Sequence, residues 1–269
     1  MRVGIIGGGN MGLAYARSLV RKNIVETNDL YIYESFPERV LFLRDLQIGV
    51  LKQDLDAEIG NLDVLILAVK PQSFSELADE LKPFIKEKTI IISIMAGVRR
   101  HIILGKLVNS KIVRVMPNTP CQNGVGATGY HLYEGITDEE KKEVKRLLAS
   151  TGLCEEVAEE DDIDSVTALS GSGPAYIYLF AQSLTEAGIK MGLDQNASKK
   201  LTLQTIKGAL NLMETSEKSF DELITAVKSK GGTTEAALLN FDKNNFNKIV
   251  IESLVLAKTR AKELSDLIV

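Results

Sequence analysis

The chain has 269 residues, of which 45% are hydrophobic and 25% are charged, and its formal net charge is −4. This length predicts one or two domains with ample apolar material for a core, and the charge excludes an overall basic field for nucleic acid or a membrane surface. The longest apolar runs are far shorter than the roughly 20 residues of a membrane-spanning helix. Glycines cut the N-terminal apolar run, so we expect no signal peptide.

The chain opens with a strand, a glycine-rich turn and a helix. Arg2–Ile6 is typical of a short buried strand and Leu13–Lys22 of a helix. The segment between them fits G-x-G-x-x-G, whose glycines allow a tight turn, close approach to a pyrophosphate and close packing of helix on strand. An ordinary turn is the alternative. We expect a dinucleotide to bind at Gly7, Gly8, Gly9, Asn10, Met11 and Gly12.

Strands and helices alternate through the first half of the chain. The apolar run Asp63–Val69 is typical of a parallel strand covered on both faces. The sequence predicts further strands over 30–33, 89–94, 111–116 and 125–132. It predicts helices over 37–46, 74–85, 98–107 and 137–150. This pattern predicts a doubly wound α/β sheet of the Rossmann type.

From residue 161 the pattern is helical, with helices expected over 162–191, 195–214, 220–228, 234–240 and 244–267. Two glycines and a proline in Ser170–Ala175 predict a kink or a close backbone approach. The acidic stretch Glu155–Asp164 is expected to stabilise the start of the first of these helices. We therefore expect a dinucleotide-binding domain over residues 1–158 and a helical domain over 159–269.

The segment Ala175–Leu184 is apolar on nearly every face. A helix of this kind must be buried on all sides, which a small helical domain achieves with difficulty by itself. We therefore expect a homodimer that packs this domain against a second copy. The alternative is a central helix wrapped by its own neighbours.

Glu34 ends the second predicted strand, about 20 residues past the glycines, where a ribose-binding residue is expected. A carboxylate there accepts hydrogen bonds from the ribose hydroxyls of NAD and repels the extra phosphate of NADP. We expect NADH to be used better than NADPH. Arg39 supports the opposite preference, since an arginine can hold that phosphate.

Three further loops follow predicted parallel strands and are expected to line the same crevice. Two prolines stiffen the third loop, Met116–Pro120. The cofactor-binding residues expected in these loops are Ala68, Val69, Lys70, Pro71, Ala96, Gly97 and Asn118.

Hydride transfer to a ketone needs a strong proton donor, and the sequence offers none in a suitable place. It has no Tyr-x-x-x-Lys, and the predicted long helix carries no lysine before Lys190. The remaining candidates are hydroxyl groups, at Ser170, Ser172, Tyr176, Thr233 and Thr234. A weak acid suffices when the electrophile is a protonated imine, so the sequence favours C=N over C=O reduction.

A second glycine-rich stretch, Gly231-Gly232-Thr233-Thr234, opens a predicted helix. Its free N–H groups form a candidate site for a substrate carboxylate, with a plain helix cap as the alternative. Cys121 and Cys154 form no CxxC and indicate a reducing, cytoplasmic setting. The two histidines show no metal-ligand spacing, and we expect no metal site.

Together these motifs resemble the pyrroline-5-carboxylate reductases over essentially the whole chain. The resemblance rests on GIIGGGNMG at 4–12, AVKPQ at 68–72, MAG at 95–97, RVMPNTP at 114–120, ALSGSGPAY at 168–176 and KGGTTEAAL at 230–238. It implies NAD(P)H-dependent reduction of 1-pyrroline-5-carboxylate, a cyclic imine, to L-proline. It also implies a helical dimerisation domain and often a ring of dimers.

The resemblance further implies that Gly231, Gly232, Thr233 and Thr234 bind the substrate, with the Thr234 hydroxyl nearest the imine nitrogen. Glu160 matches an acidic position that contacts the substrate. One departure is Lys230, which stands where the family usually has proline. The alternatives are a related cyclic-imine or hydroxyacid reductase, or a nonenzymatic nucleotide-binding paralogue.

Overall fold

The computed structural model describes residues 1–107, 109 and 111–267. It divides into two compact units, one made of Met1–Pro174 with Leu256–Val269 and the other of Ala175–Val255. This division assigns residues 159–174 to the first unit. The domain boundary expected at residue 158 stays a prediction.

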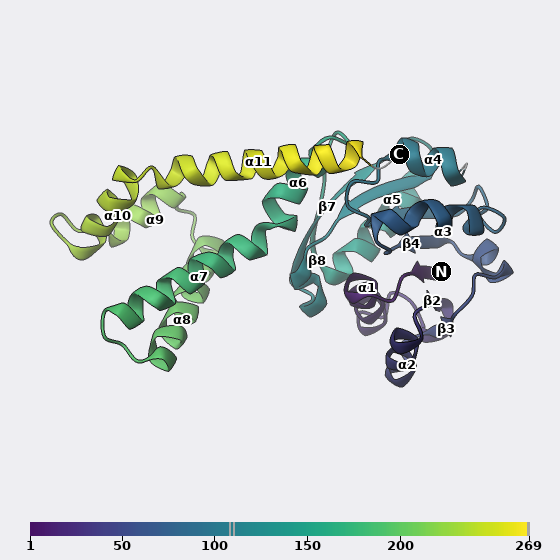
Figure 1. Ribbon diagram of the computed structural model, residues 1–269, viewed down its shortest axis with the longest axis horizontal. Coiled ribbons are helices and arrows are strands. Elements are labelled where there is room, and N and C mark those ends of the chain that lie inside the picture. Colours follow the sequence, from purple (N-terminus) through teal and green to yellow (C-terminus); the bar gives the residue numbers. More distant parts are fainter. Residues whose placement is uncertain (108, 110, 268–269) are drawn as a thin grey trace. The chain divides into compact units, whose positions relative to one another are not determined.

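The first unit contains one twisted sheet (Figure 1). Within the described residues it has eight strands in the order β3-β2-β1-β4-β5-β6-β7-β8, all neighbours parallel except β6 and β7. The strands are β1 (Val3–Ile6), β2 (Leu30–Tyr33), β3 (Val50–Lys52), β4 (Val64–Leu67), β5 (Ile90–Ser93), β6 (Ile112–Met116), β7 (Gly126–Leu132) and β8 (Gly152–Glu156). This order confirms the doubly wound fold class.

Helices alternate with these strands. They are α1 (Asn10–Arg21), α2 (Pro37–Leu46), α3 (Phe74–Leu81), α4 (Arg100–Leu107), α5 (Asp138–Leu148) and α6 (Asp162–Val166). Helix α5 begins with a complete capping box, in which Thr137 and Glu140 satisfy each other's backbone N–H groups. The expected capping threonine is therefore confirmed.

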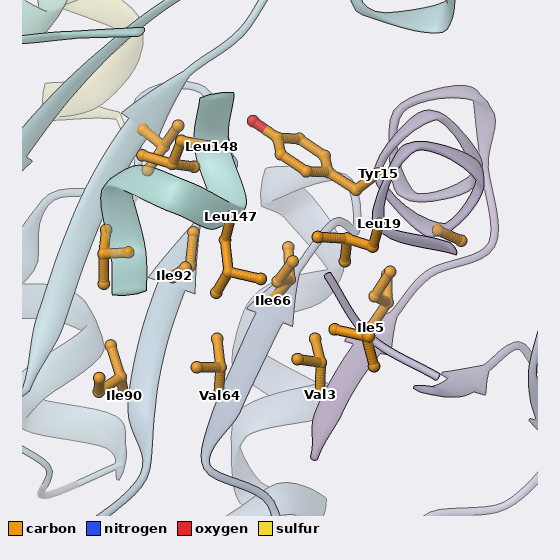
Figure 2. Packing of buried hydrophobic residues seen from close by; sticks show 14 of the residues in the cluster. Val3, Ile5, Tyr15, Leu19, Val64, Ile66, Ile90, Ile92, Leu147 and Leu148 are labelled. Carbon is orange, nitrogen blue, oxygen red and sulfur yellow. The ribbon is translucent and has the colours of Figure 1, made fainter. Parts of the chain in front are cut away.

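Two hydrophobic clusters cover the two faces of the sheet. Because successive strand residues point to opposite faces, Ile5 packs in one cluster and Ile6 in the other. Figure 2 shows the first cluster, where Leu19 of α1 and Leu147 of α5 lie over alternate residues of β1, β4 and β5. The second cluster contains Phe74 and other residues of α3 and α4. Burial on both faces explains why these strands are continuously apolar.

Three local expectations need correction. Strands β3 and β8 were not predicted, because three residues give too short a pattern and GLCEE lacks an apolar run. Glu155 and Glu156 therefore lie on the exposed part of edge strand β8, and only the later acids occupy the first turn of α6. The helix expected over 162–191 is interrupted after Val166 by a π-helical turn, Thr167–Gly171. That turn confirms the expected irregularity near Ser170–Ala175.

The second unit consists of helices in the part of the chain that the structure describes (Figure 1, green to yellow). They are α7 (Gly173–Lys190), α8 (Gln195–Thr215), α9 (Phe220–Val227), α10 (Thr233–Lys243) and α11 (Phe246–Asp266), of which α11 continues past the unit's end. None of the described helices is long and apolar enough to cross a membrane.

The helical unit leaves large apolar side chains uncovered. Among described residues, every hydrophobic residue in the buried core lies at or before Ala168. In α7, Tyr178 is 64% exposed and Leu179 is 65% exposed, and Leu203 of α8 and Ile251 of α11 are also exposed. The single chain therefore does not wrap this unit around a core of its own.

Candidate functional site

The glycine turn after β1 requires its glycines. Gly7 has a φ of +99° and donates its N–H to the carbonyl of Tyr33 at 2.9 Å. A Cβ at Gly7 would lie 2.6 Å from the carbonyl oxygen of Ala68, and one at Gly12 would lie 2.0 Å from that of Gly7. The turn is therefore tight, and α1 lies directly against it, as expected from the G-x-G-x-x-G pattern.

Open space lies in front of α1. Gly9 is the N-cap residue of this helix, and a Cβ built there meets no atom within 4 Å. Asn10 is exposed and Met11 is partly exposed. The first N–H groups of a helix have no intrahelical acceptor, so a pyrophosphate fits this opening by both shape and charge.

Glu34 and Arg39 both bind the backbone of the glycine turn. Glu34 Oε2 accepts the Gly8 N–H and its Oε1 accepts the Phe36 N–H, each at 2.9 Å. Arg39 donates from Nε to the carbonyl oxygen of Gly8 at 2.6 Å. The carboxylate is buried, and it lies at the glycine turn where a ribose-binding residue was expected.

The strand order brings the other predicted cofactor residues to the same edge of the sheet. Strands β2, β1, β4, β5 and β6 are neighbours in the sheet. Glu34 follows β2, the glycine turn follows β1, and Ala68 follows β4. Ala96 lies in the loop after β5 and Asn118 in the loop after β6. The Ala68 N–H binds the carbonyl of Ile6 at 2.8 Å. The remaining loop residues at this edge are Val69, Lys70, Pro71 and Gly97. Carboxyl ends of parallel strands are where open α/β sheets bind ligands.

Asn118 joins this edge to the π-helical turn. Its Nδ2 donates to the Ser170 carbonyl at 3.0 Å, and its Oδ1 accepts the Ala127 N–H at 2.9 Å. A Cβ at Gly171 would lie 2.8 Å from Met116 Cε. Gly171 therefore lets the π-helical turn approach the end of β6, and Asn118 also binds that turn.

Glu160 lies beside a buried arginine that was not among the predicted site residues. Its Oε1 accepts the Arg100 N–H at 2.8 Å and Arg114 Nη1 at 2.9 Å. Burial raises the pKa of Glu160, but the Arg100 N–H, the Tyr133 hydroxyl and the Arg114 charge outweigh it and hold that pKa below its usual value. The signal for Arg114 was a lone cation inside the apolar strand Ile112–Met116.

A second ion-pair group adjoins this one. Arg99 binds Asp161 at 2.6 Å and Asp164 at 3.3 Å, joining the start of α4 to the start of α6. Burial raises the pKa of Asp164, because Arg99 and Arg114 compensate only part of its desolvation. The acidic stretch thus neutralises arginines as well as supporting a helix start.

The second glycine-rich stretch lies in the helical unit. Gly231 has a φ of +72°, and Gly232 is the N-cap of α10, which begins at Thr233. A Cβ at Gly232 would lie 2.3 Å from Ser229 Oγ. The Gly231 N–H is already bound by Glu235 Oε2 at 2.6 Å. Thr233 and Thr234 occupy the first turn of α10, where backbone N–H groups have no intrahelical acceptor.

A metal site and a cavity are also candidate parts of a functional site, beside the glycine turn and the start of α10. Within the described residues, no group of three or more His, Cys, Asp or Glu could hold a metal ion. A cavity of about 650 Å³ lies between α2 and the segment after β3, and includes none of the predicted site residues. Lys52 and Asp56 in its wall pair with each other at 2.8 Å.

Two family models match parts of the chain. Residues 160–264 match the family described as pyrroline-5-carboxylate reductase dimerisation, and residues 2–97 match NADP oxidoreductase coenzyme F420-dependent. The pyrroline-5-carboxylate reductase of Pseudomonas aeruginosa is 34% identical, covering 98% of this chain and 97% of its own. That of Aquifex aeolicus is 35% identical, covering 98% and 97%.

Solved structures agree. A pyrroline-5-carboxylate reductase from Coxiella burnetii has a TM-score of 0.91 and 35% identity over 98% of both chains. The Plasmodium falciparum pyrroline carboxylate reductase, solved with NADP bound, has a TM-score of 0.87 and 32% identity over 98% of both. With the glycine turn, the SGSGPAY turn and the GGTT helix start all in place, this chain belongs to the pyrroline-5-carboxylate reductase family.

Proposed function

We propose that this protein reduces 1-pyrroline-5-carboxylate to L-proline with NADH or NADPH. The bound cofactor would supply a hydride to the carbon of the protonated imine, whose ring nitrogen already carries the proton of the product amine. The observation that carries the proposal is the glycine turn, tight at Gly7 and Gly12 and open at Gly9, in a chain of this family. Oxidation of NADH by purified protein, dependent on added pyrroline-5-carboxylate, tests it. A folded protein without turnover would overturn it.

The chain's own residues bind and orient the substrate in this proposal. The Gly231–Thr234 segment holds the substrate carboxylate through the backbone N–H groups of the first turn of α10, because the Gly231 and Gly232 N–H groups are bound to Glu235 and Ser229. The Thr234 hydroxyl accepts a hydrogen bond from the protonated ring nitrogen. No strong acid is needed, because a protonated imine is already electrophilic. Glu160, which accepts the Arg100 N–H and Arg114 Nη1 through Oε1, is the acidic residue proposed to contact the substrate.

Replacing Thr234 tests its catalytic role. Thr234→Ala is expected to lose on the order of tenfold to thousandfold in kcat/KM, as for other single catalytic hydrogen bonds. Thr234→Ser keeps a hydroxyl and serves as the matched control, so most of the activity should return. If Thr234→Ala turns over normally, this residue acts only as part of a helix start.

We propose that NADH is preferred over NADPH. The support is the Glu34 carboxylate, held at the glycine turn, whose charge opposes a nearby phosphate. Comparing kcat/KM for the two cofactors tests the preference, and a higher value with NADPH would refute it. Glu34→Gln removes the charge and can keep only one of the two backbone hydrogen bonds, and it is expected to narrow the ratio of kcat/KM for NADH to that for NADPH.

We propose that two chains associate through the helical unit to form a homodimer in the cytoplasm. The support is the exposed apolar surface of α7, α8 and α11 in a segment matched to a dimerisation family. A ring of dimers is the larger assembly to be tested. Light scattering of the purified protein measures the mass, and a monomer at micromolar concentration would refute the dimer.

A further inference from the structure

Both backbone polar groups of Gly8 are held by side chains from the segment that follows β2. Glu34 accepts the Gly8 N–H at 2.9 Å, and Arg39 Nε donates to the Gly8 carbonyl oxygen at 2.6 Å. Leu43 closes the space above Gly8, where a Cβ would lie 2.3 Å from Leu43 Cδ1. The β2–α2 segment therefore determines the orientation of this residue.

The Arg39 guanidinium is poorly placed to bind a ligand phosphate. Its Nε is engaged by Gly8, and its Nη2 is buried, with no hydrogen-bond partner among the described residues. Its central carbon lies 4.7 Å from the centre of the Phe42 ring. Two of the three guanidinium nitrogens are therefore withdrawn from any phosphate that arrives from solvent.

The hydrogen bond to Gly8 has a consequence for the next residue. The described chain contains no cis peptide bond, and a trans peptide points its C=O and the following N–H in opposite directions. Holding the Gly8 carbonyl toward Arg39 therefore turns the Gly9 N–H away from the Arg39 side chain. Gly9 is the residue at the open end of α1, where the pyrophosphate is proposed to bind.

We infer that Arg39 is a positioning residue for the pyrophosphate-binding turn, serving NADH and NADPH alike, and is not a reader of the 2′-phosphate. This inference rests on the proposed function, since it concerns the cofactor site of that reaction. It separates the two roles left open by the sequence: Glu34 bears on the choice of cofactor, and Arg39 on the affinity for both.

Calorimetric titration with two cofactor fragments tests the inference without turnover. The fragments are 5′-ADP, which carries the pyrophosphate, and 2′,5′-ADP, which adds the 2′-phosphate. Arg39→Met is expected to weaken both fragments by a similar factor, on the order of tenfold for one charged hydrogen bond. Arg39→Lys restores a cationic donor and is expected to recover part of the loss for both.

Arg44→Met is the matched control, because it removes the same charge from an exposed position on the same helix. It should leave both affinities unchanged, which separates a local hydrogen bond from a general loss of charge. Melting temperatures of all variants show whether folding has changed, and a purely structural role for Arg39 would lower stability while leaving fragment affinity intact in the folded protein.

Two outcomes would overturn the inference. Loss of affinity for 2′,5′-ADP alone would make Arg39 the reader of the 2′-phosphate, and unchanged affinity for both fragments would remove any role in the turn. Failure of the proposed function looks different, because the wild-type protein would then show no oxidation of NADH that depends on pyrroline-5-carboxylate, whatever its affinity for the two fragments.

Discussion

The pair formed by Glu160 and Arg114 gives a prediction about stability that can be worked out from the structure. The Arg114 side chain is 3% exposed, and that of Glu160 is 22% exposed, with 2.9 Å between Nη1 and Oε1. Glu160→Gln keeps the shape and an acceptor for the Arg100 N–H, but removes the charge. The substitution removes the charge that is hydrogen-bonded to the buried guanidinium and leaves Asp164 as the remaining nearby carboxyl group.

Breaking a fully buried ion pair by removing one partner costs about 3–5 kcal/mol. Glu160 is partly exposed, so water compensates some of the lost charge, and the glutamine keeps a neutral hydrogen bond. We therefore expect the free energy of unfolding to fall by about 2 kcal/mol at neutral pH.

The effect has a definite pH dependence. Glu160 has a lower pKa in the folded protein than its usual value of 4.5, so its ionised form stabilises the fold. This contribution is fully present above pH 4.5 and is lost as the pH falls through the folded-state pKa. The difference between wild type and Glu160→Gln is therefore expected to shrink as the pH falls below 4.5.

Urea unfolding followed by circular dichroism measures the difference at pH 7 and at acidic pH, at one protein concentration because self-association shifts apparent stability. Glu159→Gln is the matched control, because it makes the same charge change at the exposed neighbouring position. If Glu160→Gln costs no more than Glu159→Gln, the pair does not stabilise the fold and the reasoning fails.

Two further predictions concern the turn and the assembly. Gly12→Ala places a Cβ 2.0 Å from the Gly7 carbonyl oxygen, so overpacking of about 1–3 kcal/mol should exceed the helix-propensity gain of about 1 kcal/mol. Urea unfolding of Gly12→Ala should therefore show a lower free energy of unfolding than wild type. Gly105→Ala is the control, because a Cβ there meets no atom within 4 Å and should not destabilise the protein. Equal stability of the two variants would contradict the prediction. Leu179→Asp should weaken the dimer in sedimentation equilibrium because it charges an exposed apolar helix face, whereas Leu153→Asp, equally exposed on β8, should not. An unchanged dimer constant for Leu179→Asp would exclude this face from the interface.

The sequence predicted most of the elements because their signals are local. The run Asp63–Val69 is typical of a strand covered on both faces, and the structure has strand β4 within it. Thr137 predicted a helix start that the structure confirms as a capping box with Glu140. Strand β8 lacked such a signal, since its place in the sheet depends on pairing with β7 and not on its own composition.

The sequence did not predict which groups the site side chains bind. The sequence marked Glu34 as a ribose-binding candidate and Arg39 as its competitor, but did not indicate that both reach the backbone of Gly8. It marked Glu160 without its partner Arg114, which lies 46 residues away in the chain. Asn118 likewise meets Ser170 across 52 residues.

Glycine spacing, apolar periodicity and helix caps are properties of neighbouring residues, so the sequence by itself determined the fold class, the glycine turn at Gly7–Gly12 and the existence of a helix after Gly231-Gly232. Tertiary structure decided which charges pair and which backbone groups they hold. Those contacts join residues far apart in the chain, and their geometry exists only after strands β2, β1 and β6 take their places in the sheet.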